Sequence, residues 1–195
     1  MTKGFSQVEG IDYHDIFSPV VRYESVHLMI ALAALQQWHM NSVDVKTAFL
    51  YGELDEELFL EQPEGFKKKG QEHKVFHLKK ALYGLKQAAL QWWQALDKPM
   101  EAMGFKHFNS DSGVFVLIHS GRLQVIVIVY VDDAVFMGPQ KHLVNTYKEC
   151  FMCTWECRDL GDTEEFLRMR ITHQKGVISL DQKDYLATVL KCFNM

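Results

Sequence analysis

The feature that most constrains the fold is a long apolar stretch interrupted by two adjacent acids, Asp132 and Asp133. The segment before them, Val125–Val131, consists of β-branched residues with one tyrosine, and Ala134–Gly138 follows. Such runs are typical of buried strands, so the sequence predicts two strands joined by a tight turn that carries both carboxylates. Adjacent carboxylates repel each other unless they are hydrated, protonated or bound to a cation.

Two interpretations of this acidic turn compete. Aspartate is a common turn residue because its side chain hydrogen-bonds the nearby backbone, so an Asp-Asp pair taken alone is more often a solvated turn. The alternative is a site for divalent metal ions, which prefer hard oxygen ligands on a rigid hairpin. The choice depends on what the rest of the chain supplies.

Length and charge set broad limits. A chain of 195 residues predicts one domain, residues 1–195, or one domain with a small subdomain. The net charge of -4 gives no support for a nucleic-acid partner, but the lysines are clustered. A basic segment of this kind contacts phosphates locally or forms a solvated loop, and both interpretations stay open. Its members are Lys67, Lys68, Lys69, Lys74, Lys79, Lys80 and Lys86.

No apolar run is long enough to span a bilayer and no secretory signal is visible, so we expect no membrane partner. The default location is intracellular, with no distinction between cytoplasm and nucleus. Three of the four cysteines, Cys150, Cys153 and Cys157, have a C-x2-C-x3-C spacing without a matching second half. Buried or reduced thiols are therefore favoured over a zinc site.

Hydrophobic periodicity predicts strands and helices in mixed order. Because they alternate without the regular pattern of a parallel sheet, we expect an α+β fold. The expected helices are Glu24–Gln37, a segment from Gly84 to Gly104, one around Leu143–Phe151, and a last helix capped by Asp181. The expected strands, besides the two beside the acids, are Trp38–Asp44, Val75–Leu78, Gly113–Ile118, Phe166–Thr172 and Val177–Leu180.

Asp44 is a third informative acid, because it ends a predicted strand. It either caps the turn that begins at Lys46 or joins Asp132 and Asp133 in the folded chain. Nucleotidyl transfer uses two divalent ions roughly 3.5–4 Å apart, and three carboxylates on rigid strands can bridge such a pair. Mg²⁺ keeps waters and takes other ligands from phosphates, so few protein ligands suffice.

Several motifs in the same order resemble one protein family. Tyr130–Asp133 looks like the active-site box of reverse transcriptases, and Asp44–Phe49 resembles the first acidic motif of that family. The stretches Leu50–Leu54, Glu61–Phe66 and Leu82–Ala88 are similar to the copia-type long-terminal-repeat retrotransposons. The resemblance covers nearly the whole chain, which makes it far more specific than an isolated acidic pair.

This resemblance implies a fold, a cofactor and a reaction. The expected fold is a reverse-transcriptase palm with partial fingers, an antiparallel sheet packed on helices. Asp44, Asp132 and Asp133 would be catalytic and would hold two Mg²⁺ ions, with Mn²⁺ as the alternative and the Val45 carbonyl as a further ligand. The expected partners are an RNA or DNA template with its primer and deoxynucleoside triphosphates.

The resemblance also implies roles for three further residues. Phe49 would lie under the sugar of the incoming nucleotide and exclude a 2′-hydroxyl, although without the motif it would be assigned to the core. Tyr130 would lie against the primer terminus or the base pair. Gln87 would contact the nucleotide sugar or the template base, although without the family it would be assigned to a helix surface.

The chain departs from the family pattern in ways that keep two functions open. Met1 begins just after a basic finger strand that the family carries, and no thumb or RNase H region follows, so we expect a domain truncated at both ends. Ala89-Leu90 replaces Pro-Arg, Arg168 replaces a glycine and Tyr51 replaces an asparagine. The chain is thus either a DNA polymerase domain or a non-catalytic remnant with weak nucleic-acid binding. An unrelated two-metal hydrolase is supported only by the acids.

Overall fold

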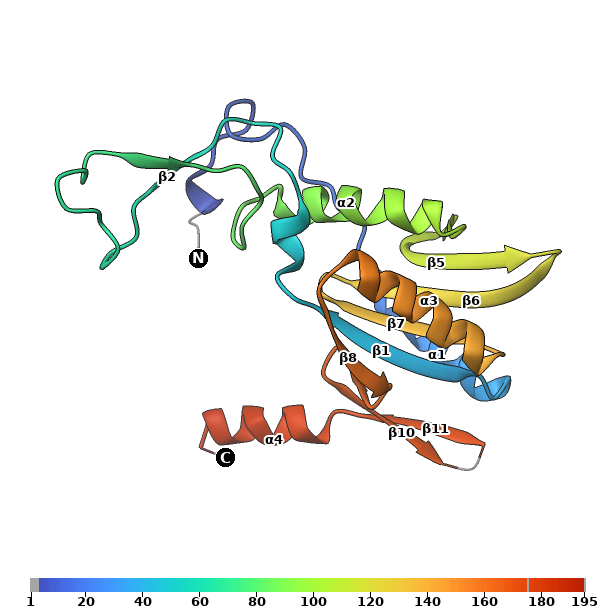
Figure 1. Cartoon of the computed structure of the whole chain (residues 1–195). Helices are drawn as coiled ribbons and strands as arrows, with labels where there is room; N and C mark the ends of the chain where they lie inside the picture. Colours follow the sequence, from blue (N-terminus) through green and yellow to red (C-terminus); the bar gives the residue numbers. More distant parts are fainter. Residues whose placement is uncertain (1–3, 175, 195) are drawn as a thin grey trace. The chain divides into compact units, whose positions relative to one another are not determined.

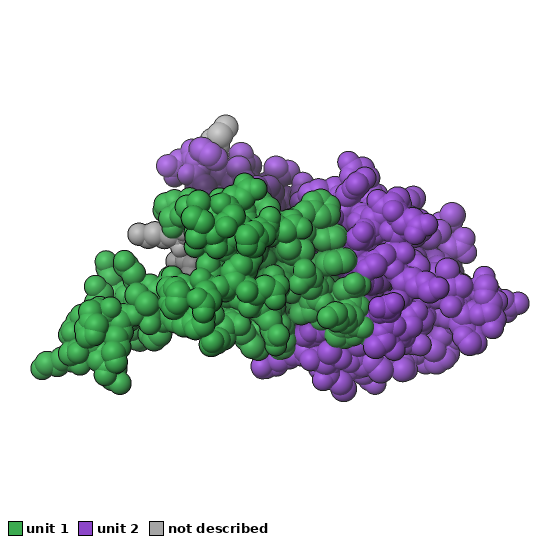
Figure 2. Space-filling model, turned by 90° about the horizontal axis from the view of Figure 1, so that it is seen from above, with its two compact units in different colours: residues 1–19, 47–99 green, residues 20–46, 100–195 purple. Residues whose placement is uncertain are grey.

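Two compact units make up the chain, whose computed structural model describes residues 4–174 and 176–194. Unit 1 comprises Met1–Pro19 and Thr47–Pro99, and unit 2 comprises Val20–Lys46 and Met100–Met195 (Figure 2). The three acids singled out from the sequence all belong to unit 2, whereas Phe49 and Gln87 belong to unit 1.

Unit 2 is built on a six-stranded sheet in which every neighbouring pair is antiparallel. The sequence anticipated the central strands, because their β-branched residues suit a sheet that is covered on both faces. In spatial order the strands are β4 (Lys106–Phe108), β5 (Asp111–His119), β6 (Arg122–Tyr130), β7 (Asp133–Gly138), β1 (His39–Val45) and β8 (Cys157–Asp162).

Helices cover the two faces of this sheet, α1 (Tyr23–Leu35) behind it and α3 (Lys141–Thr154) in front of it (Figure 1). On the α3 side, the Phe136 ring of β7 meets the Phe151 ring edge to face at 5.3 Å. The other face belongs to the main core, which joins α1 to the sheet and to the last three strands. Its buried members include Val26, Ile30, Ala33, Met40, Ile126, Ile128, Val135, Met137, Phe166, Met169 and Ile171.

The chain passes from α1 into β1 through a left-handed residue. Gln37 has a φ of 52°, and the Trp38 N–H donates to the Ala33 carbonyl at 2.8 Å. This arrangement satisfies a carbonyl that the end of a helix leaves without a partner. The helix predicted at Glu24–Gln37 and the strand predicted at Trp38–Asp44 are therefore confirmed to within two residues.

The C-terminal part of unit 2 is a small three-stranded sheet followed by a helix: β9 (Glu165–Phe166), β10 (Met169–Gln174), β11 (Val177–Asp181) and α4 (Lys183–Cys192). The prediction of one continuous strand at Phe166–Thr172 is wrong, because a turn at Leu167 and Arg168 divides the segment into β9 and β10. Both turn residues have positive φ, 52° and 61°, a conformation that glycine adopts more easily. The prediction that Asp181 caps the last helix is wrong by one residue, because Gln182 is the N-cap of α4; Asp181 ends β11 and its carboxylate accepts a hydrogen bond from the Lys183 N–H.

Unit 1 contains the short helices η1 (Gly4–Ser6) and η2 (Ala48–Tyr51), the strands β2 (Phe59–Glu61) and β3 (Val75–His77), and most of α2 (Ala88–Ala102). The helix expected from Gly84 begins four residues later, since Gly84 has a φ of 102°. Gly52 lies against α2 so closely that a Cβ there would be 2.7 Å from the Gln91 Cβ. Trp92 is buried and its ring lies 6.0 Å from that of Tyr51.

The predicted α+β class is confirmed, with four α-helices and mostly antiparallel strands in the described residues. Within 4–174 and 176–194, no helix has the length and apolar character needed to cross a membrane. All four cysteine thiols are free; Cys150, Cys153 and Cys192 are exposed and Cys157 is half-buried.

Candidate functional site

A row of four residues, here termed the acid row, crosses one end of the large sheet: Arg158, Asp44, Asp133 and Tyr130. Asp44 on β1 is the register partner of Asp133 on β7 and of Arg158 on β8. Tyr130 on β6 is the partner of Asp133. Directly opposed residues of antiparallel strands share a face, with Cβ atoms roughly 4.5–5.5 Å apart. The fold therefore brings together two carboxylates that are far apart in the sequence.

The third acid, Asp132, is exposed in the two-residue turn between β6 and β7. The other turn residue, Val131, has a φ of 54°, which is unusual for a β-branched side chain and costs of order 1 kcal/mol or more. The Asp132 carbonyl accepts a hydrogen bond of 2.7 Å from the Val45 N–H, next to Asp44. This bond ties the tip of the hairpin to β1 and brings all three acids to the same end of the sheet.

The charges at this end of the sheet act on one another. Burial, and after it the negative charges of Asp132, Asp44 and Glu165, together raise the pKa of Asp133 from 3.8 to about 6. Burial and the charge of Asp44 likewise raise the pKa of the Cys157 thiol to about 11. The site is thus rich in negative charge that the fold itself does not fully neutralise.

Glu165 and Arg158 were not anticipated from the sequence. Glu165 lies on β9, which has only two residues, and Arg158 lies on β8, whose residues are largely exposed. Neither strand therefore gives a clear periodic signal in the sequence. Arg158 is the one cation in the row, and it stands directly opposite Asp44. Only the pairing of β8 with β1 reveals this position.

The donor chemistry of the site fits a hard divalent cation. Three aspartates supply carboxylate oxygens, and a bound cation would favour the ionised form of Asp133, whose pKa burial and the neighbouring carboxylates raise. As arranged in the part of the chain that the structure describes, however, no three His, Cys, Asp or Glu side chains form a group ready to hold a metal ion. Val45 lies beside Asp44, and its carbonyl as a ligand stays a prediction.

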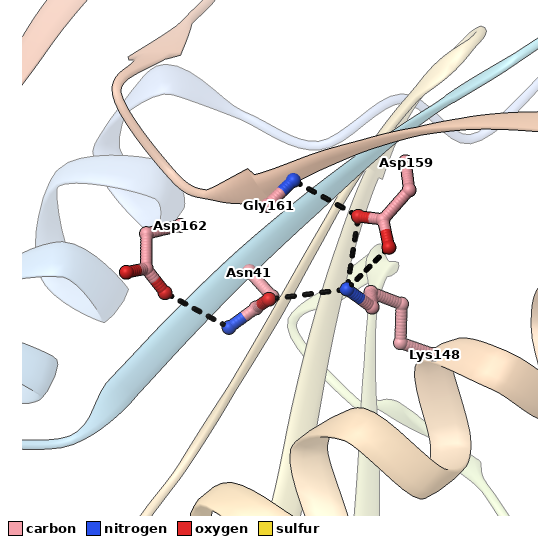
Figure 3. A network of polar contacts seen from close by, with 5 residues as sticks. All are labelled: Asn41, Lys148, Asp159, Gly161 and Asp162. Atoms are coloured by element: carbon pink, nitrogen blue, oxygen red, sulfur yellow. Dashed lines mark hydrogen bonds and ion pairs between the residues drawn. The ribbon is translucent and has the colours of Figure 1, made fainter.

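A polar network around the buried Lys148 and Asn41 lies where α3 meets β1 and β8 (Figure 3). The Lys148 ammonium, on a side chain only 8% exposed, donates to both carboxylate oxygens of Asp159 at 2.9 Å and to Asn41 Oδ1 at 3.1 Å. The Asn41 amide in turn reaches Asp162 Oδ1 at 3.4 Å. The network joins β8 to β1 next to the residues Arg158 and Asp44.

A cavity of about 980 Å³ in unit 2 is lined by none of the four residues of the acid row. Its lining includes Glu165, Arg168, Arg170 and Tyr185, and none of the three aspartates. An ion pair between Arg170 and Asp184 joins β10 to α4 at its wall. The cavity therefore does not mark the carboxylate site.

The two predicted site residues of unit 1 have well-defined surroundings. Phe49 is half-buried on η2, with its ring 5.7 Å from that of Tyr83. Gln87 is fully buried just before α2, so its assignment to a helix surface is wrong. Its amide accepts from Gln7 and donates to the Asp12 carbonyl at 2.8 Å and to Glu56 at 3.2 Å. A contact between Gln87 and a nucleotide or template base stays a prediction.

The family model and the similar proteins that match the chain point to the same family. Residues 1–195 match the family model described as reverse transcriptase (RNA-dependent DNA polymerase). The chain is 39% identical, over its whole length, to the retrovirus-related Pol polyprotein from transposon TNT 1-94 of Nicotiana tabacum, and 32% identical to that from transposon RE1 of Arabidopsis thaliana. It covers only 15% and 13% of those two proteins. No solved structure matches the chain.

Proposed function

The chain belongs to the reverse transcriptase (RNA-dependent DNA polymerase) family of copia-type Pol polyproteins, and from this premise we propose that it adds deoxynucleotides to a primer 3′ end, with Asp44, Asp132 and Asp133 as its catalytic carboxylates. The observation that carries the proposal is the register pairing of Asp44 with Asp133 beside the Asp132 turn. Two strands that are distant in sequence place like charges together, an arrangement that costs stability unless a ligand uses it.

The three carboxylates occupy different positions, which suits the binding of two metal ions. Asp132 is exposed at the tip, Asp133 is half-buried, and Asp44 lies across from it on β1. They would hold two Mg²⁺ ions, or Mn²⁺, together with the Val45 carbonyl. Such ions supply charge stabilisation for an in-line displacement at phosphorus when bound. The half-buried Tyr130 at the end of the row would lie against the primer terminus.

We assign unit 2 to the palm and unit 1 to part of the fingers. The assignment is supported by the antiparallel sheet that carries the acid row in unit 2 and by the positions of Phe49 and Gln87 in unit 1. Template and primer would be held mainly through their sugar–phosphate backbone, because a copying enzyme must accept every sequence.

The direct test is primer extension on an RNA and on a DNA template with deoxynucleotides and Mg²⁺. Extension products are expected from the wild-type chain, and their absence from an Asp132→Asn preparation made in parallel excludes a contaminating polymerase. No extension from either template, even after a basic finger segment is fused before Met1, would favour the non-catalytic remnant. Gln87 is hydrogen-bonded within the protein to Gln7, Asp12 and Glu56, and this observation favours the alternative.

Phe49→Ala is expected to weaken the exclusion of ribonucleotides. The half-buried ring is held beside Tyr83, and its removal would leave space for a 2′-hydroxyl. Steric discrimination of this size changes the ratio of kcat/KM values roughly 10- to 100-fold. The measurement is single-nucleotide extension with matched deoxy- and ribonucleotides, and Phe49→Tyr, which keeps the ring, is the control. An active Phe49→Ala enzyme with unchanged selectivity would remove Phe49 from this role.

A further inference from the structure

A two-stranded ribbon in unit 1 exposes aromatic side chains that have no hydrophobic cover. Strands β2 and β3 pair antiparallel, with Phe59 opposite His77 and their rings 5.1 Å apart. Phe59 is 60% exposed, and Phe66, in the connection between the strands, is 80% exposed. Phe76 on β3 is 49% exposed and lies on the opposite face of the ribbon, because its register partner is Leu60. Exposed aromatic rings of this kind are typical of a binding site.

The connection between β2 and β3 is folded around one buried side chain. Gln62, which is 8% exposed, donates through its amide to the Gln71 carbonyl at 2.7 Å and to the Lys74 carbonyl at 2.8 Å. Its side-chain oxygen accepts from the Lys68 N–H at 2.8 Å. A single amide thus fixes three points of the loop, so the lysines project from an ordered backbone.

The charge of this region is opposite to that of the chain as a whole. Residues 65–80 carry six lysines and one glutamate, Glu72, and therefore a net charge of +5, whereas the chain carries -4. All six lysines are exposed. The nearby acids Glu61 and Glu64 precede this segment, which limits the positive surface to the loop and the end of β3. The lysines are Lys67, Lys68, Lys69, Lys74, Lys79 and Lys80.

We infer that residues 59–80, here termed the basic ribbon, bind single-stranded nucleic acid. The lysines contact successive phosphates, and bases stack on the exposed rings of Phe59 and Phe66. A single strand is the fitting partner because a duplex keeps the faces of its bases stacked inside. The inference rests on the proposed function, in which a template strand is the nucleic acid, and it assigns that strand a surface outside the carboxylate site.

The test is fluorescence anisotropy of a labelled single-stranded DNA oligonucleotide of mixed sequence, with the full chain and without nucleotides or divalent ions. Phe59→Ala is expected to weaken binding roughly 5- to 100-fold with an unchanged salt dependence, because it removes stacking and no charge. The triple change Lys67→Ala, Lys68→Ala, Lys69→Ala is expected to lower the slope of log affinity against log salt by about 2.

Gln62→Leu separates an ordered surface from mere positive charge. It keeps every lysine but removes the three hydrogen bonds that fold the loop. Weaker binding by this variant, at unchanged helix content in circular dichroism, supports a built site. Wild-type affinity in Gln62→Leu together with wild-type affinity in Phe59→Ala would overturn the inference.

Matched controls lie elsewhere on the chain. Phe193→Ala removes another exposed ring, and the triple change Lys98→Ala, Lys106→Ala, Lys183→Ala removes three other exposed lysines. Losses as large in these controls as in the ribbon variants would also overturn the inference. With duplex DNA as the probe, Phe59→Ala is expected to bind as the wild type does. Because the assay contains no nucleotides, a chain that extends no primer can still give either result.

Discussion

Asp133→Asn is expected to abolish primer extension and, at the same time, to make the fold more resistant to urea at pH 7.5. The ionised Asp133 is half-buried among other carboxylates, which raises its pKa from 3.8 to about 6. A shift of about two units corresponds to roughly 3 kcal/mol, and partial exposure to solvent reduces this to about 1–2 kcal/mol. Asparagine removes that cost but also removes the anion, and extension should fall by at least about a hundredfold.

The stability gained in Asp133→Asn is expected to depend on pH. A carboxyl group whose pKa is higher in the folded than in the unfolded state destabilises the fold when it is ionised. The cost is absent below pH about 4, grows as pH rises towards 6, and is complete above the folded pKa of about 6. The stability gained in Asp133→Asn should therefore vanish at pH 4. Urea unfolding at both pH values measures it, and a less stable Asp133→Asn at pH 7.5 would contradict the prediction.

Two additions sharpen the experiment. Asp132→Asn serves as the matched control, since Asp132 is exposed and only one of three charges acting on Asp133, so a smaller gain in stability is expected. Mg²⁺ should raise the midpoint of unfolding of the wild type more than that of Asp133→Asn, because a ligand that binds only the folded state stabilises it. Equal Mg²⁺ effects on both proteins would separate the carboxylates from metal binding.

Asp159→Ala is expected to destabilise the protein by about 3 kcal/mol. The Lys148 ammonium is buried, and its strongest contacts are the two hydrogen bonds to the Asp159 carboxylate. Without that carboxylate the cation keeps only the neutral Asn41 oxygen, and an uncompensated buried charge costs several kcal/mol. The hydrogen bonds from Lys148 also lower the pKa of Asp159, so this stabilisation is present above its ordinary pKa and is lost as pH falls through its lowered pKa.

Removal of the other partner should cost less. Lys148→Met keeps the apolar stem and leaves Asp159, whose side chain is 46% exposed and can be hydrated, so about 1 kcal/mol is expected. Asp162→Ala breaks only the 3.4 Å contact with Asn41 and should lie within about 0.5 kcal/mol of the wild type. Chemical denaturation of the three variants gives the order. A larger loss in Lys148→Met than in Asp159→Ala would show that the stability of this network does not depend mainly on neutralising the buried Lys148 ammonium.

The sequence predicted those parts of the fold in which hydrophobic periodicity is strong. The hairpin of β6 and β7, with Asp132 and Asp133 at its turn, follows from β-branched runs on either side, and α1 follows from its apolar residues. The edge strand β8 was missed, because its residues are mostly exposed and it is held by pairing with β1 and by the Lys148–Asp159 bond. Such a strand exists through tertiary contacts, which local pattern does not encode.

The sequence pointed to the three acids of the candidate site, but it did not predict which residues surround them. Asp44, Asp132 and Asp133 could be chosen from motifs, but their register and the raised pKa of Asp133 depend on which strands pair and how deeply they are buried. Gln87 illustrates the limit, since a polar residue in a surface-like segment proves to be fully buried and hydrogen-bonded to three distant residues.

The strand order has a consequence for how the protein is made. Strand β1 is synthesised early, yet both of its neighbours, β7 and β8, come from the last half of the chain. A ribosome that adds about 5–20 residues per second needs roughly 5–20 s to pass from Asp44 to Asp133. During that interval β1 offers two unsatisfied edges, which invite association between nascent chains. Yield in cells should therefore respond to chaperone supply and growth temperature.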